Sequence, residues 1–464
     1  MTTKSITQTL AEWVVQARYE DIPAIGVDRM KERTVDSLGV MIGGMSIPTG
    51  QNLARWVRAQ GSRPEASLIG CGFKTTASLA ALANGAAGHA LEFDDTSTFS
   101  GHYAAPLTAA ALAVGEKVGA SGRETILAWM VGWNVIAHTS RISMALGGPT
   151  LLLKGWFNQG FQSTLGMAAM SAKLMKMDVR QTRMALGSAA NGMAGVMKNR
   201  ATDAKSFVAG NAAMHGVMAA EMVALGCTAS EDILDGEDGV ARMVGAPGVD
   251  INKVLDGLGT WDLAANSSSL KPYACCAAGH WSQDALRLIL ERRPTRPEEI
   301  EAIEVEINDY LLPNMPFALP QTGLQGKYSL EYDLVTIALD GRAGMFQYTD
   351  AMVRRPEAQG LMKRVTRLPQ PGTGRPESRV VLKLKSGETL EETVKISHGT
   401  PGDPLSDQEV LDKFHECAGT LLSPAARARV LDLCNRLDGL ERVGDLAEAL
   451  SGADQDVRAM APAE

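Results

Sequence analysis

Three short segments of this 464-residue chain concentrate side chains that move protons or bind anions. The first, residues 89–102, contains His89, Glu92, Asp94, Asp95, Thr96 and His102. Imidazole and carboxyl groups act as acid–base catalysts and as metal ligands, so the cluster is compatible with either role. The same residue types are also typical of a helix end, where Asp and Thr cap free N–H groups while core histidines form hydrogen bonds. The spacing alone leaves these interpretations open.

The second segment, residues 198–205, places cations ahead of a predicted helix. Lys198, Arg200 and Lys205 precede a helical pattern that extends from about Asn211 to Leu225. Cations beside the unpaired N–H groups of a helix start form a site for anions. A solvated basic loop has the same composition, and the spacing does not exclude it.

The third segment, residues 271–280, leads into another helical pattern. Lys271, Tyr273 and His280 suit anion binding and proton transfer, whereas the alternative is a domain linker that carries structural aromatics. No feature of the sequence indicates a lowered thiol pKa for the adjacent Cys275 and Cys276. We therefore interpret the two cysteines as small buried residues.

Mostly helical elements must position these segments. Apolar residues recur at helical spacing over about residues 1–265, and residues 75–90 are rich in alanine and glycine, which predicts a buried helix packed closely against its neighbours. Apolar and polar residues alternate over Ile303–Ile307 and again over Leu382–Ile396, which predicts a strand and a hairpin. A helical pattern returns after Pro404, but this segment is too short to form a good core by itself. We therefore expect the C-terminal helices to rejoin the N-terminal helical domain.

The composition argues against several classes of protein. Lysine and arginine total 45 and aspartate and glutamate 53, a formal net charge of −8, which disfavours nucleic acid and anionic membranes as partners. No apolar run reaches the ~18 residues of a membrane span, and the N-terminus lacks the pattern of a secretory signal. Six cysteines without a CxxC pair predict neither disulfides nor a thiolate zinc site, and they fit a cytoplasmic protein.

Five motifs, in order along the chain, make the sequence similar to a known family. They are HALEFDDT (89–96) with His102 after it, GMAGVMKNRATDAKSFVAGNAAMHG (192–216), LKPYACCAAGH (270–280), GKYSLEYDLVTIALDG (326–341) and VTRLPQP (365–371). The sequence resembles the MmgE/PrpD family, which includes 2-methylcitrate dehydratase, cis-aconitate decarboxylase and iminodisuccinate epimerase.

The resemblance implies a mostly α fold, a homodimer without metal or organic cofactor, and a site between two domains. A large all-helical domain would comprise residues 1–267 and 400–464, and a smaller α+β lid domain residues 268–399. The residues that the resemblance assigns to catalysis are His102, Lys205, Lys271, His280 and Tyr332. Those assigned to substrate binding are Glu92, Asp94, Thr96, Lys198, Ser329 and, as a departure from the family, Phe157.

Two departures from the family pattern bear on the substrate. Glu92 stands where relatives usually have aspartate, and Phe157 stands where relatives often have histidine. A phenyl ring cannot transfer a proton or bind a carboxylate, so we expect a different or less charged substrate. Alternatively, Phe157 points into the helical core and Gln159 or Gln162 replaces the histidine.

The expected function is that of a cofactor-independent lyase. We expect a dehydratase-like enzyme that removes a proton next to a carboxylate in a small hydroxy- or unsaturated di- or tricarboxylate. An epimerase or decarboxylase of the same family is the first alternative, and a noncatalytic binding protein that kept the fold is the second. We expect no metal near residues 89–102, because the family resemblance places lysines there that would repel a cation.

Overall fold

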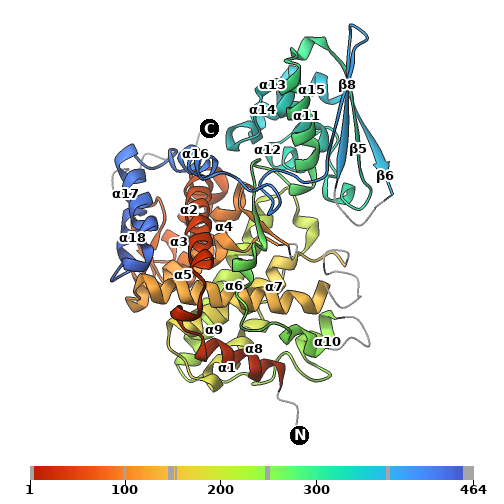
Figure 1. Ribbon diagram of the computed structural model, residues 1–464. Helices are drawn as coiled ribbons and strands as arrows, with labels where there is room; N and C mark the ends of the chain where they lie inside the picture. The colour runs from red at the N-terminus through yellow and green to blue at the C-terminus, as the bar shows by residue number, and fades with distance from the viewer. Residues whose placement is uncertain are drawn as a thin grey trace.

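The computed structural model describes residues 5–98, 101–144, 151, 154–245, 251–371 and 377–452. Most of them form a large body of helices (Figure 1). The helices of this body before the lid are α1 (Ile6–Gln16), α2 (Ala24–Ser46), α3 (Pro48–Ala59), α4 (Ala77–Ala90), α5 (Ala104–Val118), α6 (Gly122–Met144), α7 (Asn158–Leu174), α8 (Val179–Ala190), α9 (Asp203–Ala224) and α10 (Val240–Val244).

Small residues allow the central helices of the body to pack with their backbones in contact. A Cβ on Gly44 of α2 would overlap the carbonyl oxygen of Ala87 in α4, and a Cβ on Gly210 of α9 would lie 2.3 Å from the carbonyl oxygen of Leu82 in α4. Any larger side chain at these positions would force the helices apart. Helix α4, which carries the first polar segment at its end, is therefore held between α2 and α9.

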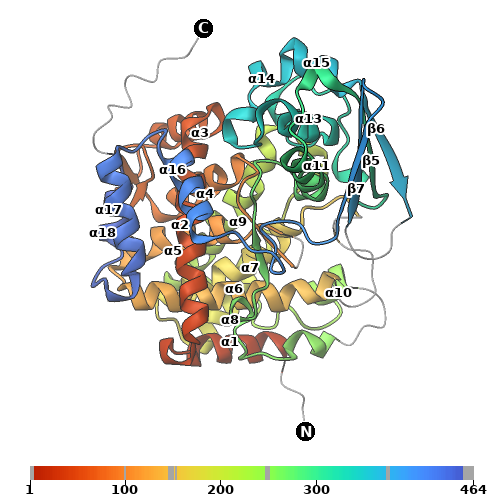
Figure 2. The same cartoon turned by 45° about the horizontal axis from the view of Figure 1, so that its top comes forward.

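The lid domain is a sheet with helices on one face (Figure 2). Its strands β5 (Ile300–Asn308), β6 (Val365–Gln370), β7 (Ser378–Leu384) and β8 (Thr389–Val394) have the order β6-β5-β7-β8, in which β5 and β6 are parallel and the other pairs antiparallel. Its helices are α11 (His280–Arg292), α12 (Gly323–Gly326), α13 (Leu330–Asp340), α14 (Asp350–Arg354) and α15 (Pro356–Met362). Ile303, Val305 and Ile307 of β5 are buried, as the alternating pattern predicts.

Two connections tie the lid to the body. On the way into the lid, β3 (Asp95–Ser97) pairs with β4 (Ser268–Leu270) in a short antiparallel sheet. On the way out, the chain forms α16 (Asp407–Ala418), α17 (Pro424–Asn435) and α18 (Gly444–Ala449). Helix α16 packs on α2, where Gly39 contacts Phe414, and the segment leading into α18 packs on α5, where Gly115 contacts Val443 (Figure 1).

The observed fold class is the predicted one, mostly α with a smaller α+β domain. The contacts of α16 and α18 support our proposal of a discontinuous helical domain, although its ends, residues 1–4 and 453–464, lie outside the described residues. One helix start differs from the prediction: α9 begins at Asp203, so Lys205 lies in its first turn instead of in a loop before it. In the described part of the chain, no helix combines the length and apolar character needed to cross a bilayer.

Candidate active site

The turn after α4 directs two carboxylates into the protein. Glu92, just after the helix, has a left-handed backbone (φ 55°) that reverses the chain before β3. Both Glu92 and Asp94 are buried. In the β3–β4 pair, Asp95 lies opposite Leu270. This pairing brings Lys271, the next residue after β4, beside the two carboxylates.

Two lysines offset the charge of these carboxylates. Lys205 Nζ donates to Glu92 Oε1, and Lys271 Nζ donates to the main-chain oxygen of Glu92 at 2.9 Å. Lys271 Nζ also lies 3.5 Å from Glu92 Oε2 and 3.7 Å from Asp94 Oδ1. Burial acts to raise the pKa of both carboxyl groups, but the nearby lysines and histidines hold it below its usual range, so both groups are ionised at neutral pH.

The two ammonium groups are shifted in opposite directions. Burial lowers the pKa of Lys205, although Glu92 opposes the change. Burial acts on Lys271 as well, but Glu92 and Asp94 together raise its pKa above the usual value. Lys271 is therefore a permanent cation, whereas Lys205 releases its proton more readily than an exposed lysine does.

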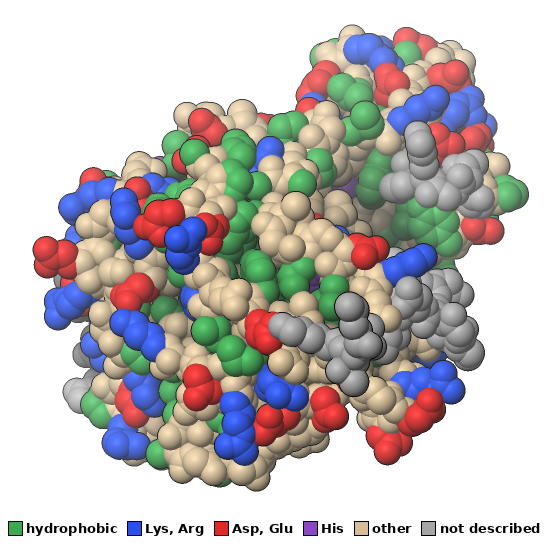
Figure 3. Space-filling view, turned by 60° about the horizontal axis from the view of Figure 1, so that its bottom comes forward, with side chains coloured by type: hydrophobic (Ala, Val, Ile, Leu, Met, Phe, Trp, Pro, Cys, Tyr) green, Lys and Arg blue, Asp and Glu red, His purple; other side chains and the backbone are tan. Residues whose placement is uncertain are grey.

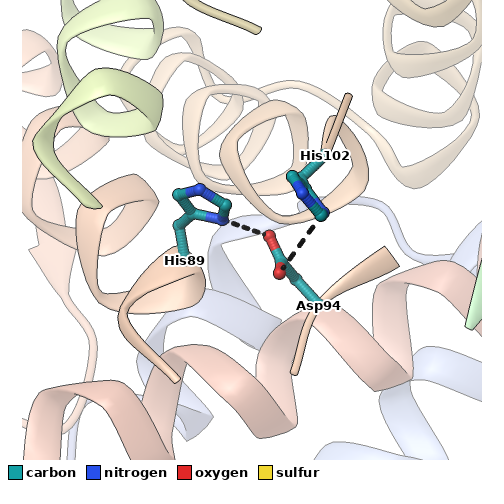
Figure 4. Close-up of side chains that lie close together, drawn as sticks. All are labelled: His89, Asp94 and His102. Atoms are coloured by element: carbon teal, nitrogen blue, oxygen red, sulfur yellow. Dashed lines mark hydrogen bonds and ion pairs between the residues drawn. The ribbon is translucent and has the colours of Figure 1, made fainter. Parts of the chain in front are cut away.

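His89 connects the carboxylates to Lys205 and to helix α7. Its Nδ1 lies 2.6 Å from Asp94 Oδ2, which can only accept, so Nδ1 carries the proton (Figure 4). In the neutral ring, Nε2 is then an acceptor, and it faces Lys205 Nζ at 2.5 Å and Gln159 Nε2 at 2.6 Å. Sequence analysis placed His89 in the polar cluster but did not select it as a site residue.

His102 is held as a neutral base. Its Nδ1 lies 2.5 Å from the main-chain oxygen of Asp95 and donates to it, which leaves Nε2 as a hydrogen-bond acceptor. The Asp95 carboxyl in turn accepts the main-chain N–H groups of Tyr103 and Ala104, which fixes the start of α5. Burial and the Lys271 ammonium lower the pKa of His102 to about 3, so the ring is neutral at physiological pH.

His280 starts α11 at the other side of Lys271. It is buried, its ring packs edge-on against Tyr273 with centroids 5.3 Å apart, and its Nε2 has no hydrogen-bond partner among the described residues. Burial and the charge of Lys271 lower its pKa to about 3. A buried ring nitrogen without a partner is available to a bound ligand.

A third lysine, Lys327, reaches the site from the lid. It is buried, and its Nζ donates to the main-chain oxygen of Ala90 at 2.7 Å. Glu92, Lys205, Lys327 and Tyr328 line one narrow pocket. Figure 3 shows a hollow between the lid and the body, with a histidine side chain at its bottom. Lys327 is not among the site residues predicted from the sequence, although it lies in the fourth motif. Its position two residues before the Ser329 helix cap is the signal that could have indicated it.

Two family models match the chain, one before the start of the lid and one after it. The model of the MmgE/PrpD N-terminal domain matches residues 8–250, and that of the MmgE/PrpD C-terminal domain matches residues 273–437. The chain belongs to the MmgE/PrpD family. The C-terminal match extends beyond the lid and includes α16 and α17, which return to the helical body.

Members of the MmgE/PrpD family with curated functions are similar to this chain over nearly its whole length. Cis-aconitate decarboxylase of Mus musculus is 26% identical over 97% of this chain and 94% of its own. The Homo sapiens protein of the same name is also 26% identical, over 97% and 96% of the two chains. Cis-aconitate decarboxylase of Aspergillus terreus is 24% identical over 96% of each.

Three of the residues assigned from the MmgE/PrpD motifs lie apart from this cluster. Tyr332 is buried in the lid, and its hydroxyl donates to the main-chain oxygen of Gln347 at 2.6 Å. Ser329 caps α13 by accepting the N–H of Tyr332 at 3.1 Å. Lys198 is exposed and makes no hydrogen bond or ion pair with the residues that the structure describes. We therefore interpret Tyr332 and Ser329 as structural and leave Lys198 outside the proposed site.

The remaining assigned residues border the cluster. Thr96 is half-buried in β3, and its hydroxyl has no partner among the described residues. Phe157 is buried at the start of α7, with its ring centroid 6.0 Å from Lys205 Nζ. It thus lies beside the site, while Gln159, two residues further on, is the α7 residue that contacts His89. The side-chain oxygen of Gln162 instead accepts a hydrogen bond from the Tyr103 hydroxyl.

In the described part of the chain, one group of side chains has ligand atoms close enough together to bind a metal ion. Ligand atoms of His89, Asp94 and His102 lie within 4.8 Å of one another. Lys205 Nζ is 2.5 Å from His89 Nε2, and Lys271 Nζ is 3.7 Å from Asp94 Oδ1. An ion bound there would face two ammonium groups, so the absence of a functional metal stays our prediction.

The adjacent cysteines do not have the environment of nucleophiles. Cys275 is fully buried and its Sγ donates to Gln283 Oε1 at 3.3 Å. Burial raises the pKa of Cys275 well above its usual value, and burial likewise raises the pKa of Cys276. Both thiols are therefore protonated at neutral pH.

Proposed function

We propose that the protein is a cofactor-independent carboxy-lyase that decarboxylates cis-aconitate or a closely related unsaturated tricarboxylate. The observation that carries the proposal is the clustering of three buried lysines around Glu92 in an acidic protein. Lys205 and Lys327 line one pocket with Glu92, and Lys271 Nζ lies 3.5 Å from its carboxylate. Decarboxylase relatives that match over nearly the whole chain supply the reaction class.

The pocket suits a reaction in which negative charge develops on the substrate. When CO2 leaves, the electrons of the broken C–C bond delocalise toward a neighbouring carboxylate to give an enolate-like state. Preplaced cations in a site shielded from water stabilise such a state more than they do in bulk water. Lys271, whose pKa is raised, supplies a permanent charge for this purpose, and the neutral His102 offers a hydrogen-bond acceptor at Nε2.

Sequence analysis favoured dehydration, and the curated relatives shift the preference to decarboxylation. Both reactions use the same developing charge and differ in the leaving group, so the cluster of lysines and carboxylates is compatible with either. Dehydration of a hydroxytricarboxylate remains the second candidate because Phe157 replaces the histidine that many relatives carry.

Product analysis separates the candidates. The purified protein is incubated in deuterated water with cis-aconitate, methylcitrate or iminodisuccinate and followed by proton NMR together with CO2 release. We expect CO2 and a dicarboxylate product from cis-aconitate, with one deuterium incorporated from solvent. Formation of an alkene from methylcitrate without CO2, or exchange of the α-proton of iminodisuccinate without net change, would instead identify a dehydratase or an epimerase.

Two variants test whether turnover belongs to this pocket. Lys271→Met removes the permanent cation and should lower kcat/KM by roughly 100-fold or more, the range for loss of one electrostatic contact to the transition state. Lys154→Met is the matched control because Lys154 is exposed. Equal activity of the two variants would mean that the reaction takes place elsewhere.

A further inference from the structure

Lys327 differs from the other two buried lysines near Glu92 in the carboxylates that surround it. Lys205 faces Glu92, and Lys271 lies within ion-pair distance of Glu92 and Asp94. No carboxylate of the described residues lies within ion-pair distance of Lys327 Nζ, whose hydrogen bond goes to the neutral main-chain oxygen of Ala90. Of these three lysines, Lys327 is therefore the one without an ion-pair partner among the described residues.

The lid presents Lys327 on a rigid support. Lys327 directly follows α12, and its main-chain N–H donates to the oxygen of Gly323, the first residue of that helix. Its own main-chain oxygen accepts the N–H of Cys276 at 2.9 Å. The next element, α13, is capped two residues later by Ser329. Because these bonds fix the backbone to the lid, the ammonium group enters the pocket only when lid and body are together, as they are here.

We propose that Lys327 is the proton donor of the reaction, delivered to the substrate carbon by closure of the lid on the body. This inference rests on the proposed carboxy-lyase function and names the acid within the same site. The hydrogen bond to Ala90 holds the ammonium group at the pocket wall until an anionic substrate competes for it.

The step balances without an oxidant or reductant. Loss of CO2 leaves the electron pair of the broken C–C bond on the substrate. That pair forms the new C–H bond with a proton from Lys327, whose N–H bond breaks and leaves a neutral amine. Water from the solvent returns a proton to the amine, so one proton is consumed for each CO2 released.

Burial supports this role by making the proton easier to transfer. Burial, together with the positive charges of Lys205 and Lys271, lowers the pKa of Lys327 to about 8, against the pull of Glu92. A general acid works best when its pKa lies near the pH of the reaction. The titratable groups that face Lys327 or share its pocket are His89, Glu92, Asp203, Lys205, Lys271, Cys275 and Tyr328.

Two substitutions separate the role of proton donor from two other roles of Lys327. One is that of a clamp, in which its hydrogen bond to Ala90 joins lid and body, and the other is that of an anchor, in which its charge binds the substrate. Lys327→Arg keeps the positive charge and a donor to Ala90 but does not release its proton, because arginine has a pKa above about 12. Lys327→Met removes both. Lys363→Met, at an exposed lysine of the lid, is the matched control.

With whichever substrate the parent protein turns over, we expect Lys327→Arg to lower kcat by roughly 100-fold or more with KM changed little, the range for loss of a general acid. The donor must be protonated, so kcat/KM of the parent should fall as the pH rises through about 8, and this limb should be absent from the residual activity of Lys327→Arg. If Lys327→Arg retains the kcat of the parent, the lysine serves only as a clamp or anchor and the inference is wrong.

A measurement that needs no turnover keeps this test separate from the proposed function. In protein labelled with carbon-13 lysine, the Lys327 resonance is assigned by its loss in Lys327→Met and titrated by NMR. A midpoint within about one unit of pH 8 supports the inference even if cis-aconitate is not the substrate. A midpoint outside that range overturns it, whatever the enzyme proves to catalyse.

Discussion

At the scale of single residues, the site is a set of charges whose protonation states are set by burial and by one another. Glu92 stays ionised because Lys205 and Lys271 face it, and Asp94 stays ionised because His89 donates to it and Lys271 lies nearby. Lys271 stays cationic because these two carboxylates face it. His102 is neutral because burial and Lys271 disfavour its charged form. The least charged part of the site is the start of α7, where Phe157 and Gln159 lie near Lys205 and His89.

Phe157→His tests how this apolar position limits the substrate. A phenyl ring leaves a facing polar group of a tricarboxylate unpaired, which costs about 1–3 kcal/mol or roughly 5- to 150-fold in binding. We therefore expect Phe157→His to raise kcat/KM for cis-aconitate by roughly 5-fold or more, measured by CO2 release. Phe157→Leu, which stays apolar, should not show the gain.

Gln159→Leu decides the alternative, in which the amide already replaces the missing histidine. In that case Phe157→His brings no gain, and the parent protein works at ordinary enzyme rates. Gln159→Leu then lowers kcat/KM by roughly 5-fold or more, because the lost hydrogen bond is worth about 1 kcal/mol. That combination of results would contradict the specificity argument from Phe157.

At the scale of elements, helix α16, which comes after the lid in the chain, contacts the two segments that carry the site. Lys413 of α16 is buried, lies 2.7 Å from Asp36 of α2, and donates to the main-chain oxygen of Lys271 at 3.0 Å. Its Nζ also lies 4.3 Å from the ring centroid of Phe93, the residue between Glu92 and Asp94. Lys413 thus contacts both segments that carry the site, and we interpret it as a positioning residue.

Lys413→Met should destabilise the protein by about 3–5 kcal/mol, because it leaves the buried Asp36 carboxylate without its partner. Urea unfolding measures this change. The double variant Asp36→Leu with Lys413→Met should recover most of the stability, since replacing both partners of a buried pair by apolar residues is often neutral. Its kcat should nevertheless stay below that of the parent, because Lys271 loses the donor that fixes its backbone. Recovery of both stability and kcat would show that Lys413 has no positioning role.

At the scale of the whole molecule, the site is assembled by the contact between body and lid. The body supplies His89, Glu92 and Lys205, and the lid supplies Lys327. Further bonds across the contact run from Arg200 to the main-chain oxygen of Pro313 and from His398 to Glu409 of α16, at 2.5 and 2.8 Å. The local lysines would allow a chain with net charge −8 to bind the anionic substrate that we propose.

Removal of divalent ions should change neither the thermal stability nor the activity of the protein. Any cation at His89, Asp94 and His102 would be repelled by Lys205 and Lys271, so neither folding nor turnover should need one. We expect the same Tm and kcat before and after exhaustive dialysis against a chelator. The controls are addition of Zn²⁺, Mg²⁺ or Mn²⁺ to the dialysed protein; activity lost on dialysis and restored by one of these ions would contradict the prediction.

The sequence by itself determined the fold class and the identity of the family. Helical periodicity, the alternation in β5 and the small-residue pattern of α4 are local properties, and each predicted its element. The motifs around His102, Lys205, Lys271 and His280 contain residue types that suit the chemistry we propose, because proton transfer and anion binding require few kinds of side chain.

Only the tertiary structure decided which of these residues meet and what charge each carries. Tyr332 and Ser329 share a motif with Lys327, yet the fold turns the first two into the lid and the third into the pocket. Likewise, Gln159 and Phe157 are two residues apart, but only the direction of α7 shows that the amide reaches His89. Contact between distant segments and the loss of water around them are not local properties, so the pKa of a buried lysine and the partner of a buried histidine follow from packing and not from spacing.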